Sequence, residues 1–168
     1  METPIPENEI ARLEALRQYQ ILDTDPEQAF NDLTQLAAYI CGTPMASISL
    51  VDAGRQWFKA KVGIEIDQTP RDIAFCAHAI VQPEGLIVPD ALADERFVDN
   101  PLVTSDPHIR FYAGIPLTTS EGYAIGTICV MDRMPREMTP QQVQALQALA
   151  RQTIAQLELR RHLAELAK

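Results

Sequence analysis

Residues 45–62 read MASISLVDAGRQWFKAKV, and this stretch decides the fold. Within it, residues 45–52 alternate between two sets of side chains, as a strand with two different faces does. One face would carry Ala46, Ile48 and Leu50, and the other Ser47, Ser49 and Val51. Residues 52–55 are Asp-Ala-Gly-Arg, which suits a turn, and residues 56–62 resume an extended run. The stretch therefore predicts a β-hairpin.

Three more short strands are predicted after the hairpin, at residues 86–90, 110–117 and 123–131. Together with the hairpin they make five strands, joined mostly as hairpins, so the sheet should be antiparallel. A short helix is predicted over Ile73–Val81. Residues 91–108 are rich in Asp, Pro and Asn and should form an excursion with a helical turn or two. Loops of that length inside a domain are more often functional.

Helices are predicted at both ends of the chain. The first covers residues 7–20, where Ile10, Leu13 and Leu16 recur at helical spacing. The second has Asp25 as its N-cap and Pro26 at its first position, and it ends near Gly42. These two helices should cover one face of the sheet together with the last helix, which leaves the short helix and the excursion to roof the other.

The last helix is predicted from a capping box at Thr139–Gln142 to Lys168, because no Pro or Gly intervenes. It would run roughly 40 Å, which is longer than a domain of this size needs. Its 3-4-3-4 spacing suits a helix–helix seam formed by Val143, Leu146, Ala150, Thr153 and Leu157. Two interpretations stay open. The helix packs along the sheet and frays, or it protrudes to pair with a second chain or to lead into a following domain.

Composition excludes several classes of function. The 168 residues carry a net charge of −9 spread along the chain, which disfavours nucleic acids and anionic membranes as partners. No run of about 18 apolar residues and no secretory signal is legible. Three cysteines without CxxC spacing argue against a disulfide framework or a zinc site, so a cytoplasmic location is expected.

Catalytic signatures are missing from the sequence. It has no GxGxxG, P-loop, HExxH or GxSxG pattern, so we expect no enzyme, no catalytic residue and no metal ligand. Cys76 and His78 are two apart on a helix and do not face each other, so they form no nucleophile–base pair. Trp57 and Phe58 point to opposite faces of a strand, one toward the core and the other toward a cavity or a partner.

A second aromatic pair follows an arginine, in the order Arg110, Phe111, Tyr112. Such a group could bind a planar anionic ligand by stacking and charge. The alternative, that Phe111 is a core residue and Arg110 pairs with a nearby Asp, is equally open. Four acidic residues of the excursion are expected mainly to cap helical turns: Asp90, Asp94, Glu95 and Asp99.

The order of short motifs resembles a known family. The chain carries LDT at 22–24, SLVD at 49–52, RQWFK at 55–59, TPRD at 69–72, FCAHAI at 75–80, VPDA at 88–91, FVDNP at 97–101, RFYAG at 110–114 and GTICV at 126–130. Together they resemble the GAF domains that precede histidine kinase or diguanylate cyclase modules in bacterial signalling proteins. The resemblance covers nearly the whole chain.

The resemblance implies an α/β (α+β) fold with a central antiparallel sheet of five or six strands, in the order 2-1-5-4-3 or with one extra strand. Long terminal helices and a pocket under a roof complete it. Residues 1–168 would form one sensory domain, with N-terminal helices at 1–41, the sheet and pocket at 45–131 and a signalling helix at 139–168. It would bind a small molecule, form a homodimer through the terminal helices and control a covalently linked output domain.

The ligand should contact a set of residues drawn from the FCAHAI, VPDA and RFYAG motifs: Phe75, Cys76, His78, Asp90, Arg110, Phe111 and Tyr112. The cofactor is left open, because the family binds cyclic nucleotides, bilins, haem or nothing known. Two alternatives are a ligand-free dimerisation module and an enzyme resembling free methionine-sulfoxide reductases. Such an enzyme needs a second, resolving cysteine near His108–Tyr112, where this chain has Arg110 and no cysteine. The other two cysteines, Cys41 and Cys129, lie on other predicted elements.

Overall fold

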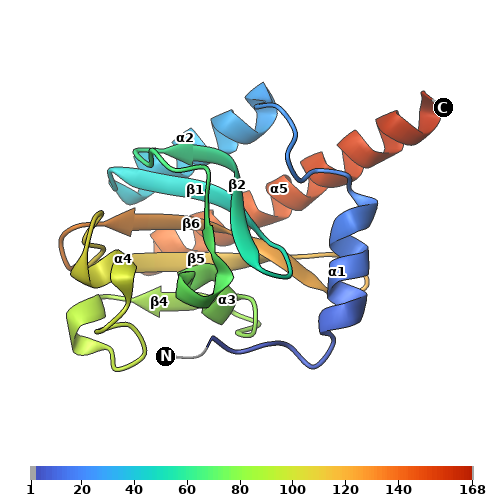
Figure 1. Cartoon of the computed structure of the whole chain (residues 1–168). Helices are drawn as coiled ribbons and strands as arrows, with labels where there is room; N and C mark the ends of the chain where they lie inside the picture. Colours follow the sequence, from blue (N-terminus) through green and yellow to red (C-terminus); the bar gives the residue numbers. More distant parts are fainter. Residues whose placement is uncertain (1–2, 168) are drawn as a thin grey trace.

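The computed structural model describes residues 3–167 (Figure 1). In chain order the elements are α1 (Glu9–Gln18), α2 (Gln28–Cys41), β1 (Met45–Val51), β2 (Arg55–Val62), β3 (Gln68–Pro70), η1 (Arg71–Ile73), α3 (Phe75–Ala79), β4 (Leu86–Val88), η2 (Ala91–Ala93), α4 (Pro101–Thr104), β5 (Phe111–Thr118), β6 (Ala124–Asp132) and α5 (Pro140–Leu166).

Six strands form one antiparallel sheet in the order β3-β2-β1-β6-β5-β4. This is the expected 2-1-5-4-3 order with one extra strand, β3, at an edge. The hairpin predicted from residues 45–62 is β1 and β2, with Leu50 opposite Trp57. The remaining strands lie within a residue or two of their predicted positions, because each is bounded by turn residues that the sequence displays.

The sheet separates two cores. The helix-side core contains Ala46, Ile48 and Leu50 of β1 with the apolar residues of α2 and α5. The roof-side core contains Val51 and residues of α3, β4 and the 91–108 excursion. Figure 1 shows α2 and α5 together on one side of the sheet and α3 and α4 on the other. The alternation read in residues 45–52 is therefore confirmed, because each face of β1 meets a different layer.

The start of α2 differs from the prediction. The helix begins at Gln28 rather than at Pro26, and its N-cap residue, Glu27, makes no capping side-chain bond. The buried Lys59 side chain donates to the Asp25 carbonyl and pairs with Glu27 at 2.7 Å, so the tertiary contact of β2 holds this segment out of the helix. The predicted end is correct, since Gly42 adopts a left-handed φ of 66° as the C-cap.

The first helix is also different from its prediction. It has ten residues, so the expected long N-terminal helix is not found among residues 3–167. Leu16 is buried as expected, but Ile10 is 79% exposed and the fully buried side chain of the first turns is Arg12. Helical spacing predicts an apolar stripe, but the buried position is taken by Arg12, which donates to the Val51 and Ala124 carbonyls at the ends of β1 and β6.

The last helix has 27 residues, and its capping box and N-terminal proline are confirmed. Of the two open interpretations, packing within the chain is the one observed for the seam positions up to Leu157. Leu146, Ala150, Thr153 and Leu157 are buried against α2 and the sheet of the same chain, so they cannot face a partner. Beyond residue 157 the helix extends past the sheet (Figure 1) and exposes Leu159, Leu163 and Leu166. Across the described residues, no helix is long and apolar enough to cross a bilayer.

Candidate functional site

A cavity of about 310 Å³ lies between the roof-side face of the sheet and the elements that cover it. Its floor is formed by β1, β5 and β6, and α3 contributes Phe75 and Cys76 to its wall. The mouth lies between the exposed loop at residues 63–66, the segment at 106–107 and Arg133. The site is therefore built from elements far apart in sequence.

Strand register sets the floor of this cavity. Met45 lies opposite Met131, and Ser47 lies opposite Cys129, on neighbouring strands β1 and β6. On β5, Tyr112 lies opposite Met131 from the other side. Because side chains two residues apart share a face, all five point to the roof and line the cavity. The floor is rich in sulfur and almost free of charge.

Hydroxyl groups surround the two thiols. The Cys76 Sγ atom lies 3.0 Å from Thr127 Oγ1, and the Tyr112 hydroxyl donates to Cys76 Sγ at 3.2 Å. The Cys129 Sγ atom lies 3.0 Å from Ser47 Oγ. Each thiol is less than 3% exposed, so these contacts supply the hydrogen bonds that buried polar groups need.

Tyr112 reaches Cys76 only because residue 114 is glycine. A Cβ atom on Gly114 would lie 2.2 Å from the Tyr112 hydroxyl oxygen, far inside van der Waals contact. The phenol therefore lies over the glycine, two residues along the same strand face. Substitution at residue 114 would displace the hydroxyl from the sulfur.

Three residues of the predicted ligand set line this cavity: Phe75, Cys76 and Tyr112. Phe111 does not, because it alternates with Tyr112 and packs in the helix-side core. Of the two open interpretations of Phe111, the core position is the one observed. It cannot stack on a ligand in the roof cavity.

The remaining three predicted ligand residues lie outside the cavity lining. Arg110 donates to the Val103 and Ile109 carbonyls at 2.9 and 3.2 Å, which ties the excursion to β5 rather than to an anion. Asp90 accepts a hydrogen bond from the Leu92 amide and caps η2, as the alternative interpretation held.

His78 is buried in the roof-side layer, with its ring centroid 4.7 Å from that of Phe97 in an edge-to-face arrangement. Its Nε2 atom has no hydrogen-bond partner among the described residues. Burial, together with the nearby Arg96 charge, lowers the pKa of His78 from its ordinary value. The ring is thus a neutral packing element between α3 and the excursion.

Sequence reasoning missed four residues of the floor: Met45, Ser47, Cys129 and Met131. Successive side chains of a strand point to opposite faces, but nothing local says which face the roof covers. In particular, Cys129 was expected on an element apart from Cys76. Cys129 does lie on another element, β6, but both thiols line one cavity, and Thr127, which contacts Cys76, is two residues from Cys129 on the same face of β6.

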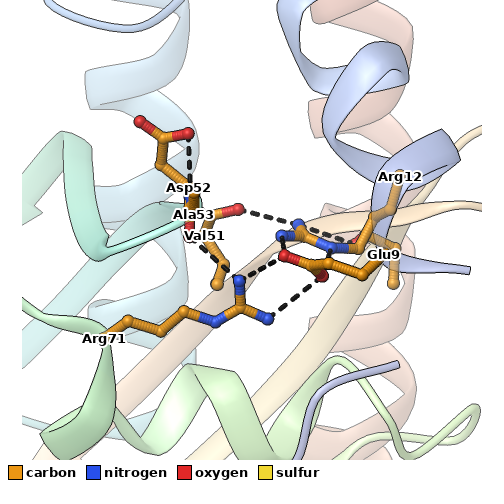
Figure 2. A network of polar contacts seen from close by, with 7 residues as sticks. Glu9, Arg12, Val51, Asp52, Ala53 and Arg71 are labelled. Carbon is orange, nitrogen blue, oxygen red and sulfur yellow. Dashed lines mark hydrogen bonds and ion pairs between the residues drawn. The ribbon is translucent and has the colours of Figure 1, made fainter. Parts of the chain in front are cut away.

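A second polar cluster joins α1 to the roof, and Figure 2 shows it from close by. Glu9 accepts hydrogen bonds from Arg12 Nε at 2.8 Å and from Arg71 Nη1 at 2.5 Å. Arg12 also donates to the Val51 carbonyl at 2.7 Å, and Arg71 to the Asp52 carbonyl at 3.1 Å. The cluster links α1, the end of β1 and η1.

Partial burial opposes the ionisation of Glu9, but the hydrogen bonds and charges of Arg12 and Arg71 outweigh it. They lower the pKa of Glu9 to about 2. The carboxylate is therefore ionised at any ordinary pH and holds two guanidinium groups together. Among residues 3–167, no group of three or more His, Cys, Asp and Glu side chains is arranged to hold a metal ion.

Comparisons with known proteins agree with this architecture. The family model described as the GAF domain matches residues 25–157. A cyclic di-GMP phosphodiesterase of Pseudomonas aeruginosa is 42% identical over 155 residues, which are 92% of this chain and 26% of that protein. The chain thus spans about a quarter of the length of this relative.

Solved structures show the same fold at low identity. The GAF domain of an Acinetobacter phosphoenolpyruvate-protein phosphotransferase superposes with a TM-score of 0.65 at 16% identity, covering 92% of this chain and 98% of that one. A domain of a putative two-component sensor histidine kinase from Sinorhizobium meliloti superposes with a TM-score of 0.61 at 20% identity, covering 84% and 95%.

Proposed function

The chain belongs to the GAF family, and from that premise we propose that it is the sensory domain of a bacterial signalling protein. A small molecule binds in the roof cavity, and the terminal helices carry the change to a covalently linked output domain. The observation that carries the proposal is the cavity itself. It has about 310 Å³ of space, mostly apolar walls and a few convergent polar groups, as ligand sites do.

The lining indicates the class of ligand. Apart from the two thiols, the polar groups inside the cavity are neutral: Ser47, Gln56 and Thr69. Charged lining residues lie at the exposed mouth: Glu65, Asp106 and Arg133. The volume is at the lower end of the range for ligand pockets. A small, neutral and weakly polar molecule fits these properties better than the planar anion expected from Arg110.

One route for the signal runs from the roof to α1. Phe75 and Cys76 of α3 line the cavity, and η1 precedes α3 with a single intervening residue, Ala74. Arg71 of η1 binds Glu9 of α1. A ligand that moves α3 therefore changes the position of the guanidinium to which α1 is attached. Differential binding to two roof positions would shift the equilibrium between them.

A second route runs from the cavity floor to α5. Met131 lines the cavity, and the next residue, Asp132, forms an ion pair with Arg136 in the connection to α5. Farther along α5, Arg160 Nη1 donates to the Tyr19 carbonyl at 3.1 Å, directly after α1. Both terminal helices are thus joined to each other and to the cavity.

The output domain is proposed from the named relative. That relative is a cyclic di-GMP phosphodiesterase, and about three quarters of its length has no counterpart in this chain. We therefore assign the phosphodiesterase chemistry of such a protein to a linked domain and the regulation to this one. Of the two contexts that the motifs suggest, histidine kinase and diguanylate cyclase, the identity of 42% over nearly the whole chain supports a role in cyclic di-GMP signalling.

Homodimerisation through α5 is part of the proposal. The apolar positions available to a partner are Leu159, Leu163 and Leu166, which follow a 4-3 spacing and are at least half exposed. The earlier apolar positions, Leu146, Leu149 and Leu157, are buried within the chain. The alternative function, a dimerisation module without a ligand, would use the same leucines and leave the cavity empty.

Native mass spectrometry of the purified chain, with an absorption spectrum, tests ligand binding first. A thermal-shift screen of neutral metabolites follows, using Ile64→Trp at the half-buried wall and Ile87→Trp on exposed β4 as a matched control. We expect one ligand class to raise the Tm of the wild type and of Ile87→Trp, but not of Ile64→Trp. A chain that retains no molecule and responds to none of the metabolites would favour the ligand-free module.

A further inference from the structure

The roof cavity holds two thiols that the sensory function does not need. Cys76 comes from α3 in the roof, and Cys129 comes from β6 in the centre of the sheet. Both line the same cavity, and α3 packs on β6. The third cysteine, Cys41, is buried in the helix-side core, on the opposite face of the sheet. The fold therefore pairs two of its three thiols and isolates the third.

Hydroxyl groups lie within hydrogen-bond distance of both sulfur atoms. Thr127 Oγ1 lies 3.0 Å from Cys76 Sγ, the Tyr112 hydroxyl donates to the same sulfur, and Ser47 Oγ lies 3.0 Å from Cys129 Sγ. Hydroxyl donors stabilise a thiolate without a neighbouring cation. A thiolate is the nucleophilic form of cysteine, so this arrangement prepares one sulfur for attack.

The two thiols differ in their protonation. Burial opposes ionisation of Cys76, but the neighbouring Cys129 thiol and the hydrogen bonds of the surrounding hydroxyls outweigh it and lower its pKa to about 7. The interaction with Cys76 and burial both raise the pKa of Cys129. Cys76 is thus the more easily ionised of the two thiols.

We infer that Cys76 and Cys129 form a redox-active dithiol that a small hydroperoxide, entering through the cavity, oxidises to a disulfide between α3 and β6. This modification stands on the sulfur geometry and does not depend on the ligand of the proposed sensory function. It adds to that function a covalent state of the same cavity.

The reaction proceeds in two steps. The Cys76 thiolate attacks one oxygen of the hydroperoxide; a sulfur–oxygen bond forms, the oxygen–oxygen bond breaks, and the departing oxygen takes a proton to leave as an alcohol or water. The Cys129 sulfur then attacks the Cys76 sulfenic sulfur, and hydroxide leaves with the Cys129 proton as water. Two thiols lose two electrons and two protons, and the hydroperoxide is reduced by two electrons.

The disulfide would join the roof covalently to the central strand. It would remove the Tyr112 hydrogen bond to the Cys76 thiolate and fix α3, which η1 connects to Arg71 and Glu9. Oxidation would therefore act on α1 through the same contacts as a ligand. A small dithiol reductant would supply the two electrons that restore the reduced form.

The test treats the reduced chain with hydrogen peroxide, blocks free thiols by alkylation under denaturing conditions, and maps the products by mass spectrometry. We expect one alkylated cysteine, Cys41, and a peptide pair that joins Cys76 to Cys129 and disappears with dithiothreitol. Cys41→Ala should behave in the same way, with no alkylated cysteine remaining. Cys129→Ala should stop at a sulfenic acid on Cys76, which dimedone captures, and Cys76→Ala should give neither product.

Three alkylatable thiols after peroxide treatment would overturn the inference, as would a disulfide that involves Cys41 or joins two chains. Circular dichroism of each variant shows that it is folded, and the conservative variants Cys76→Ser and Cys129→Ser replace any alanine variant that is not. This test measures only the state of the thiols, so its result does not depend on the outcome of the metabolite screen. Likewise, a chain that forms no disulfide can still be tested for ligand binding by the screen.

Discussion

Glu9 in the first turn of α1 binds the guanidinium of Arg71, which lies 62 residues farther along the chain at the entrance to the roof (Figure 2). The bond joins a terminal helix to η1, which precedes the α3 wall of the cavity. Arg71 is 6% exposed and depends on Glu9 for its charge partner. Loss of Glu9 would leave the nearly buried Arg71 guanidinium without its carboxylate partner.

Replacing Glu9 by Gln should lower the free energy of unfolding at pH 7 by about 2 kcal/mol, because two guanidinium groups lose their carboxylate. The folded-state pKa of Glu9, about 2, is below its ordinary 4.5, so the stabilisation is complete above pH 4.5 and is lost as the pH falls through about 2. The difference between wild type and Glu9→Gln in urea denaturation should therefore shrink over that interval. Exposed Glu7→Gln is the control, and an equal loss there would contradict the assignment.

Gly114→Ala should destabilise the domain by about 2 kcal/mol or more, because the new Cβ overlaps the Tyr112 hydroxyl and β5 is a central strand. Gly54→Ala, where a Cβ meets no atom within 4 Å, is the matched control and should be nearly neutral. Guanidinium denaturation measures both. Similar stabilities for the two variants would show that the phenol does not need its position over residue 114.

Arg136→Ala should lower the free energy of unfolding by about 1 to 2 kcal/mol. Its guanidinium donates to the Gly42 carbonyl at 2.6 Å and to the Cys41 carbonyl, where α2 ends, and it pairs with Asp132. The substitution removes a positive charge from the negative end of α2 and leaves these acceptors unpaired. Arg151→Ala, on the exposed side of α5, should change the Tm little. Equal effects would assign the loss to general charge rather than to capping.

The double variant Leu163→Gln/Leu166→Gln should convert a dimer to a monomer without lowering the Tm of the domain, because both side chains are exposed within one chain. Light scattering coupled to size exclusion measures the mass, and Ala164→Gln in the same turns is the control. A wild-type chain that is already monomeric, or a variant that stays dimeric, would refute the proposed interface.

Much of the fold was predictable, because local patterns encode it. The alternation of residues 45–52, the capping box at Thr139 and the left-handed glycine at residue 42 each depend on neighbours within a few positions. The resemblance to GAF domains supplied the strand order. The candidate site was predictable in part: Phe75, Cys76 and Tyr112 lie together at the cavity, whereas His78, Asp90, Arg110 and Phe111 have other neighbours.

By itself, the sequence determined which residues form strands and helices and which positions along them are apolar, since periodicity is a local property. Only the tertiary structure decided what each face meets. It placed Cys129 beside Cys76, turned the apolar stripe of α5 onto its own sheet rather than a partner, and moved the start of α2 through the buried Lys59. Periodicity shows that a face is buried, but the covering surface comes from packing between segments far apart in the chain.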